Sequence, residues 1–130
     1  MADLQTRDIQ TNGSGGPLRV AMSNAMVRIW KQHYGRGPTA ARAFFEAQFV
    51  FVVLEDGLTR NEQTLLDAGH EDAVRQFRLC FQETMRSEFQ AEVERLTGRT
   101  VLAHECQFTF APMMTFEIFV LDAPVEDQDH

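Results

Sequence analysis

The chain has 130 residues and a net charge of −7, and hydrophobic residues make up 44% of it. This length suits one domain with its own core, and the acidic balance argues against binding to nucleic acid or to an anionic membrane. The longest uninterrupted apolar run, Phe49 to Leu54, is far too short to span a bilayer. The first residues lack the apolar core of a signal peptide. We therefore expect a soluble cytoplasmic protein that does not insert into a membrane.

Both ends of the chain have the composition of disordered segments. Residues 1–17 show no hydrophobic periodicity and end in a run rich in Gly and Ser. Residues 122–130 contain four acidic residues and no Lys or Arg, which is typical of a solvated acidic tail. We therefore predict a disordered arm over 1–17, a single folded domain over 18–121 and a disordered tail over 122–130.

The first elements of the domain are a helix and a strand. A single apolar stripe predicts a helix from about Arg19 to His33, which Gly35 ends. A strand is predicted from about Ala43 to Leu54, and its second half is apolar on both faces. Such a strand must be covered on both sides of its sheet.

Two further helices follow the turn at Glu55–Gly57. The pattern Thr59 to Glu62 is a capping box, so a short helix is predicted from about Arg60 to Ala68. A long helix is predicted from Glu71 to Thr97, with an apolar stripe and Gly98 as its end. At about 40 Å it is longer than one face of the domain requires, so we expect part of it to project or to contact a second subunit. The predicted stripe consists of Val74, Phe77, Phe81, Met85, Phe89, Val93 and Leu96.

Two strands end the domain, at about Thr100–Phe110 and Thr115–Leu121, and the short connection between them, which contains Pro112, predicts an antiparallel hairpin. The expected fold is a two-layer α+β domain in the order α-β-α-α-β-β, with a small three-stranded mixed or antiparallel sheet and a long third helix. Three strands leave two free edges and an uncovered apolar face. We expect a homodimer to cover them.

The segment from Tyr34 to Arg42 is the most informative part of the chain. From Ile9 to Phe45 there is no Asp or Glu, and five basic residues give this stretch a charge of +5, so the remainder carries −12 (−7 − 5). A glycine-rich loop flanked by arginines can cradle a carboxylate, bicarbonate or phosphate in its backbone amides. The candidate anion-binding or partner-binding residues are Gly35, Arg36, Gly37, Pro38, Thr39 and Arg42.

Each candidate feature also has a structural interpretation. The loop is alternatively a plain helix-to-strand turn whose arginines pair with Glu46, Glu55 or the acidic tail. His104 and Cys106 share one strand face, and a buried pair is favoured over a zinc site because no second cluster of ligands exists. Glu55 and Asp56 are favoured as turn residues over an acid–base pair. We predict no catalytic residue, no metal ligand and no cofactor.

Several motifs together resemble one family, the MpsC-like domain, over about Arg19 to Leu121. The motifs are Ser23–Val27, Gly35–Thr39 with Arg42, Leu54–Thr59 with Glu62 and Leu65, Phe81–Met85, Thr97–Arg99 and Phe119–Leu121. The family label derives from a component of a Na+-translocating system that generates membrane potential. The resemblance implies a small bacterial protein that is associated with membrane ion- or bicarbonate-translocating subunits, and it carries over no catalytic residues.

Three hypotheses follow. The first is a non-enzymatic accessory or regulatory subunit, dimeric, and peripheral to the membrane through contact with transport subunits. The second is a sensor that binds a small anion or a nucleotide at the Gly-Arg-Gly-Pro-Thr loop. The third, an enzyme, ranks last because no nucleophile, base and orienting group can be named together.

Overall fold

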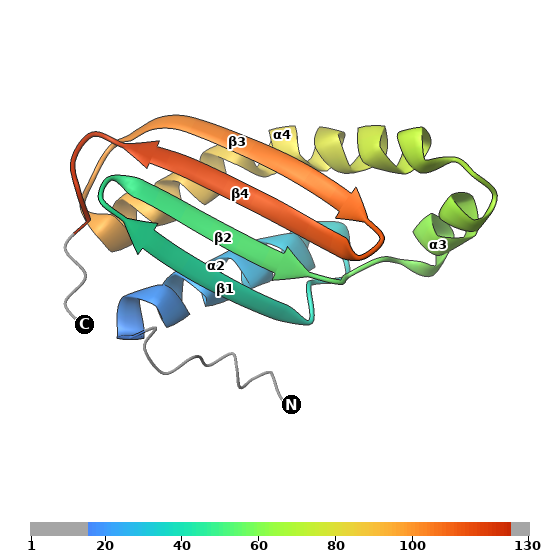
Figure 1. Ribbon diagram of the computed structural model, residues 1–130, viewed down its shortest axis with the longest axis horizontal. Helices are drawn as coiled ribbons and strands as arrows, with labels where there is room; N and C mark the ends of the chain where they lie inside the picture. The colour runs from blue at the N-terminus through green and yellow to red at the C-terminus, as the bar shows by residue number, and fades with distance from the viewer. Residues whose placement is uncertain (1–15, 126–130) are drawn as a thin grey trace.

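The computed structural model describes residues 16–125, which form a helical layer packed on one antiparallel sheet (Figure 1). The elements are α2 (Gly16–Tyr34), β1 (Ala40–Glu46), β2 (Phe49–Glu55), α3 (Arg60–Asp67), α4 (Glu71–Thr97), β3 (Val101–Phe110) and β4 (Met113–Leu121). The α+β class, the hairpin of the last two strands and the long helix over Glu71–Thr97 are confirmed. The three-stranded sheet and the order α-β-α-α-β-β are wrong.

The sheet has four strands in the order β1-β2-β4-β3, and every neighbouring pair is antiparallel. The central pair, β2 and β4, comes from opposite halves of the chain, so the sheet joins the two hairpins. Helices α2 and α4 lie behind the sheet in Figure 1, and no described element covers the face toward the viewer. We call this uncovered side the outer face.

The single strand predicted over Ala43–Leu54 is in fact most of a hairpin. β1 and β2 pair from Ala40 opposite Glu55 to Glu46 opposite Phe49, and the turn consists of Ala47 and Gln48. Ala47 adopts a φ of 54°, a left-handed value that alanine rarely takes. The turn was missed because it contains none of the residues that favour such turns, and the apolar alternation continues through it.

Helix ends follow the local signals. The capping box at Thr59 and Glu62 is present, with both reciprocal hydrogen bonds formed. Gly98 ends α4 in the left-handed conformation, with a φ of 71°. The termini predicted to be disordered, 1–17 and 122–130, lie mostly outside the described residues; Gly16 and Pro17 belong to α2, and residues 122–125 are hydrogen-bonded to Thr100 and Ala47.

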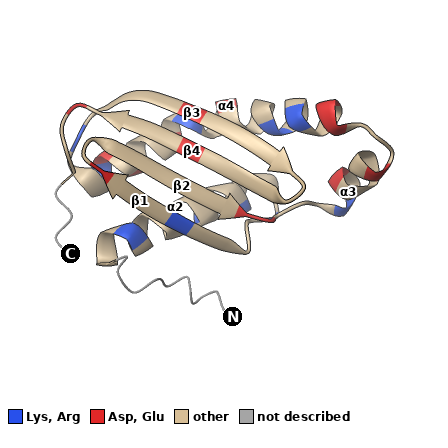
Figure 2. Ribbon diagram, viewed as in Figure 1, with Lys and Arg blue, Asp and Glu red and all other residues tan. Residues whose placement is uncertain are grey.

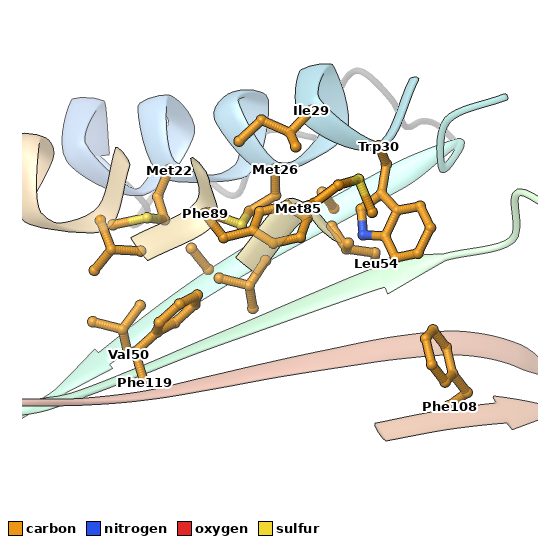
Figure 3. Packing of buried hydrophobic residues seen from close by; sticks show 14 of the residues in the cluster. Met22, Met26, Ile29, Trp30, Val50, Leu54, Met85, Phe89, Phe108 and Phe119 are labelled. Atoms are coloured by element: carbon orange, nitrogen blue, oxygen red, sulfur yellow. The ribbon is translucent and has the colours of Figure 1, made fainter. Parts of the chain in front are cut away.

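The core lies between the two long helices and the sheet (Figure 3). Side chains from α2, α4 and all four strands meet in it, among them Met22, Met26, Trp30, Met85, Phe89, Val50, Leu54, Phe108 and Phe119. The predicted stripe of α4 is buried at Val74, Met85, Phe89 and Val93 and half-buried at Phe81 and Leu96, but the prediction is wrong at Phe77. Phe77 is 56% exposed, and the polar residues Arg78 and Gln82 are buried instead.

Candidate functional site

The predicted loop passes from the helical layer to the sheet, and close packing fixes it at both ends. Gly35 has a φ of +83°, and its amide donates to the carbonyl of Lys31 at 3.1 Å, which ends α2. Gly37 lies against α2, where a Cβ atom would be 3.0 Å from Cβ of Lys31 and 3.4 Å from the carbonyl oxygen of Val27. Only glycine leaves room for this approach of loop and helix.

The loop also packs against the turn that follows β2. The amide of Thr39 donates to the carbonyl of Glu55 at 3.0 Å. Gly57 has a φ of +98°, and its missing Cβ would lie 3.4 Å from Pro38 and from the carbonyl oxygen of Gly37. The Gly35–Thr39 loop and the Glu55–Gly57 turn, which are distant in sequence, are therefore the two sides of one junction.

The structure does not bring the two predicted arginines to one point. Arg36 is exposed in the loop, whereas Arg42 is exposed on β1 between the buried Ala41 and Ala43 and so belongs to the outer face. Within residues 16–125 neither guanidinium forms an ion pair, and neither pairs with Glu46 or Glu55 as the structural interpretation predicted. An anion site at this loop stays a prediction that depends on Arg36.

Thr39 faces acidic neighbours. It lines a hollow of about 490 Å³ together with Glu55, Asp56, Pro112, Met113 and Met114. Two carboxyl groups in this hollow repel an anion, because like charges at short range raise each other's free energy. Anion binding is therefore disfavoured on the Thr39 side of the loop.

A buried ion pair that the sequence analysis missed lies beside this junction. Nε of Arg78 donates to Glu62 Oε2 at 2.7 Å. Nη2 of Arg78 donates to Glu62 Oε1 and to the carbonyl of Gly57, both at 2.9 Å. The hydroxyl of Tyr34 also donates to Glu62, and the carboxylate of Glu62 accepts a further hydrogen bond from the amide of Thr59. One carboxylate thus ties α2, α3 and α4 together.

The environment of this pair decides its protonation. Burial alone would raise the pKa of Glu62, but hydrogen bonds from Arg78, Tyr34 and the amide of Thr59 lower it below its usual value. Burial and the bond to Glu62 raise the pKa of Tyr34 far above its ordinary value, so its hydroxyl stays protonated. The guanidinium of Arg78 also lies over the rings of Tyr34 at 4.7 Å and Trp30 at 5.5 Å.

A groove of about 430 Å³ lies above this network at the α3 end of the molecule. Tyr34 and Glu62 line it together with apolar side chains, of which Leu65 and Phe77 are exposed. The lining residues are Tyr34, Thr59, Asn61, Glu62, Leu65, Val74, Phe77 and Phe81.

A second buried polar cluster lies under the middle of α4. Oε1 of Glu117 is 2.7 Å from Nε2 of His104 and accepts a bond of 2.8 Å from Gln82. Burial raises the pKa of Glu117 and of its cross-strand neighbour Cys106 above their usual values. The prediction that His104 and Cys106 lie on one strand face and point into the core is confirmed. Glu117 was missed, although one Glu in the apolar pattern of β4 was a signal.

Among residues 16–125, no group of three or more His, Cys, Asp or Glu is arranged to hold a metal ion. The same residues include no helix that is long and apolar enough to cross a bilayer.

The comparison with protein families decides the family. A family model described as "Na+-translocating membrane potential-generating system (MpsC)" matches residues 15–123. The chain belongs to the MpsC family. The MpsC match confirms the resemblance drawn from the motifs and includes all seven elements of the fold. Comparisons with curated proteins and with solved structures give no match.

Proposed function

We propose that this chain is a non-enzymatic accessory subunit of a Na+-translocating assembly that generates membrane potential, and that it joins the membrane-embedded subunits through protein contacts. The observation that carries the proposal is the family match over residues 15–123, whose description names such a system. The lack of a membrane-spanning helix in the described part of the chain agrees with a peripheral subunit.

The α2–β1 loop is the part of the structure that best suits contact with such a partner. Arg36 projects from it without an ion pair inside the described domain, in a segment that lacks acidic residues. The loop is held by α2 on one side and by the Glu55–Gly57 turn on the other. A preorganised loop loses little conformational entropy on binding. The partner surface would be acidic.

The burial of the titratable clusters supports a non-enzymatic role. Two clusters combine acid and base character, Glu62 with Arg78 and His104 with Glu117, and their side chains are at most 5% exposed. The exposed pair of His33 and Glu88, 2.7 Å apart, lies outside both clusters. A general acid or base must reach the reacting proton of a substrate. His104 and Glu117 lie between α4 and the sheet, whereas Glu62 lines the groove but has both carboxylate oxygens occupied by hydrogen bonds.

The test uses the tagged full-length chain in its source cells. We expect wild-type protein to enrich multi-spanning ion-transport subunits from detergent-solubilised membranes, and Arg36→Glu to lose most of that enrichment. Arg60→Glu is the matched control, because Arg60 is an exposed arginine on α3 whose side chain makes no described contact. Enrichment of no transport subunit over an untagged strain would contradict the proposal.

A functional measurement complements the capture. Cells that lack the chain should form a smaller Na+-dependent membrane potential in inverted vesicles, and wild-type protein should restore it while Arg36→Glu should not. An unchanged potential in the deletion strain would remove the chain from the assembly.

The second candidate is a sensor that binds bicarbonate or a nucleotide phosphate at the same loop, and the exposed, unpaired Arg36 is the observation in its favour. A ligand at 100 times its Kd should add about 2.7 kcal/mol to the free energy of unfolding. Thermal melts with bicarbonate and with nucleotides measure this effect, and Arg36→Ala should abolish it. No shift with any of these ligands would leave only the accessory role.

A further inference from the structure

The outer face of the sheet is an apolar surface that no described element covers. Figure 1 shows it from the side without helices, and Figure 2 shows that its strands carry few charges. Phe44 is 42% exposed, Phe49 44% and Ile118 36%. The rings of Phe51 and Phe116 stack on this face at 6.0 Å. An exposed apolar patch of this extent on a folded domain marks an interaction surface.

The register of the sheet arranges this face in four cross-strand rows. Ala40, Glu55, Met114 and Thr109 form the row at one end, and the other three rows carry the apolar patch. Phe44, Phe51, Ile118 and Glu105 form the central row. Arg42, Val53, Phe116 and Gln107 form the row on one side. Glu46, Phe49, Val120 and Ala103 form the row on the other side.

We propose that the outer face binds the outer face of a second copy of this chain, with the two-fold axis of the dimer along the central row. This axis places the row of Arg42 in one copy over the row of Glu46 in the other copy, with each strand over its own counterpart. Arg42 then faces Glu46 of the second copy, and the reverse pair forms at the symmetry-related position. Each copy supplies one charge of each sign on the same strand, so the charges complement each other in a two-fold arrangement.

The sizes of the apolar side chains are complementary under the same axis. Val53 lies against Phe49 of the second copy, and Phe116 lies against Val120. In both pairs a large side chain meets a small one, which is the condition for close packing between two sheets.

The area suits a dimer that dissociates on dilution. Four strands about 4.8 Å apart and about seven residues long give a face of roughly 450 Å² in plan. Two such faces give roughly 900 Å², which is below the roughly 1,200 Å² of stable interfaces and in the range of transient complexes. We therefore expect a Kd in roughly the micromolar range.

Charge argues against a lipid surface as the occupant. The outer face carries Arg42 against Glu46, Glu55 and Glu105, and the whole chain carries −7. An anionic bilayer attracts basic surfaces and repels acidic ones. Glu105 is the one unfavourable residue in the dimer. It lies in the central row on the edge strand β3, so it approaches Glu105 of the second copy.

Sedimentation velocity of the full chain from about 1 to 200 μM tests the proposal. We expect a monomer–dimer equilibrium that Ile118→Asp, in the central row, shifts fully to monomer. Phe77→Asp is the matched control, because Phe77 is an exposed aromatic residue on α4, away from the sheet. Circular dichroism checks that both variants fold.

Charge variants test the register and do not depend on a core change. Arg42→Glu and Glu46→Arg should each raise the dimer Kd by about tenfold or more, and the double variant Arg42→Glu/Glu46→Arg should restore it. Glu105→Gln should lower the Kd, because it removes the one like-charge contact.

Three outcomes would overturn the proposal. The first is a monomer at every concentration. The second is a dimer that persists in Ile118→Asp. Even if that dimer responds to the charges at Arg42 and Glu46, the result would indicate that the two copies pair through their β1 edges and not through the outer face. The third is a monomer that binds neutral or anionic vesicles through Ile118, which assigns the face to lipid.

Discussion

Glu117 is a carboxyl group in the middle of an apolar core. Its side chain is fully buried; one oxygen is bonded to His104 and Gln82, and the other has no hydrogen-bond partner among the described residues. An unpartnered buried carboxylate oxygen is costly when charged. Protonation relieves that cost, so the residue makes the stability of the fold depend on pH.

The substitution Glu117→Gln should remove this pH dependence. Burial raises the pKa of Glu117 above 4.5 in the folded state, so the folded protein binds this proton more tightly than the unfolded chain does. The free energy of unfolding of the wild type should therefore fall as the pH rises from about 4.5 through the raised pKa. Gln does not titrate, so the variant should gain stability relative to wild type as the pH rises above about 4.5.

Urea unfolding at several pH values measures this difference. Asp72→Asn is the control, because Asp72 is an exposed carboxyl group at the start of α4. A constant difference between Glu117→Gln and wild type across the range would show that Glu117 does not titrate differently in the two states.

At the scale of the element, α3 depends on one ion pair. Figure 1 shows α3 beyond the end of the sheet, where no strand packs against it. Only 3% of the side chain of Arg78 and 5% of that of Glu62 are exposed. This buried ion pair holds α3 against α4, as apolar contacts do elsewhere in the core. A buried pair is costly to break on one side, because the remaining charge stays in the protein interior.

Replacing Arg78 with Met should therefore lower the free energy of unfolding by about 3 to 5 kcal/mol. The double variant Glu62→Gln/Arg78→Met should recover part of that loss, because it removes the stranded carboxylate. A double-mutant cycle in urea measures the coupling. The control is Arg95→Ala, which breaks an exposed pair with Glu92 on α4 and should change stability little. Strictly additive effects of the two buried substitutions would contradict the coupling.

The sequence predicted the elements whose signals are local. Thr59 and Glu62 predicted the start of α3, and Gly98 predicted the end of α4, because helix caps involve residues only a few positions apart. The second role of Glu62 depends on Arg78, which lies 16 residues away on another helix. That role could not be predicted, because its partner is chosen by tertiary packing.

In the candidate loop, too, the local features were predicted and the tertiary contacts were not. Its glycines, proline and Arg36 were found from composition and charge, and their role in binding stays a prediction. Its contact with Gly57 was not predicted, because nothing local relates two segments about 20 residues apart. The placement of Arg42 on the outer face followed from a strand that begins at Ala40, three residues before the predicted start.

At the scale of the molecule, the sheet has two edges, β1 and β3, and α4 protects one of them. Arg75 donates to the carbonyl of Phe108 at 2.9 Å, and Arg86 donates to the carbonyl of His104 at 3.1 Å. Carbonyl groups four residues apart in a strand point to the same side. Carbonyls occupied by guanidinium groups are less available to pair with a strand of another molecule, so the arginines oppose edge-to-edge association.

Removing both arginines should expose this edge. We expect Arg75→Ala/Arg86→Ala to aggregate roughly several-fold faster than wild type on mild heating, with a β-rich product, because a ten-residue edge strand becomes free to pair. Light scattering and thioflavin T fluorescence measure the rate and the product. The double variant Arg60→Ala/Arg95→Ala changes the net charge equally but touches no strand carbonyl, so it separates the edge effect from the effect of a more negative net charge. Equal aggregation of the two double variants would mean that the arginines act through charge alone.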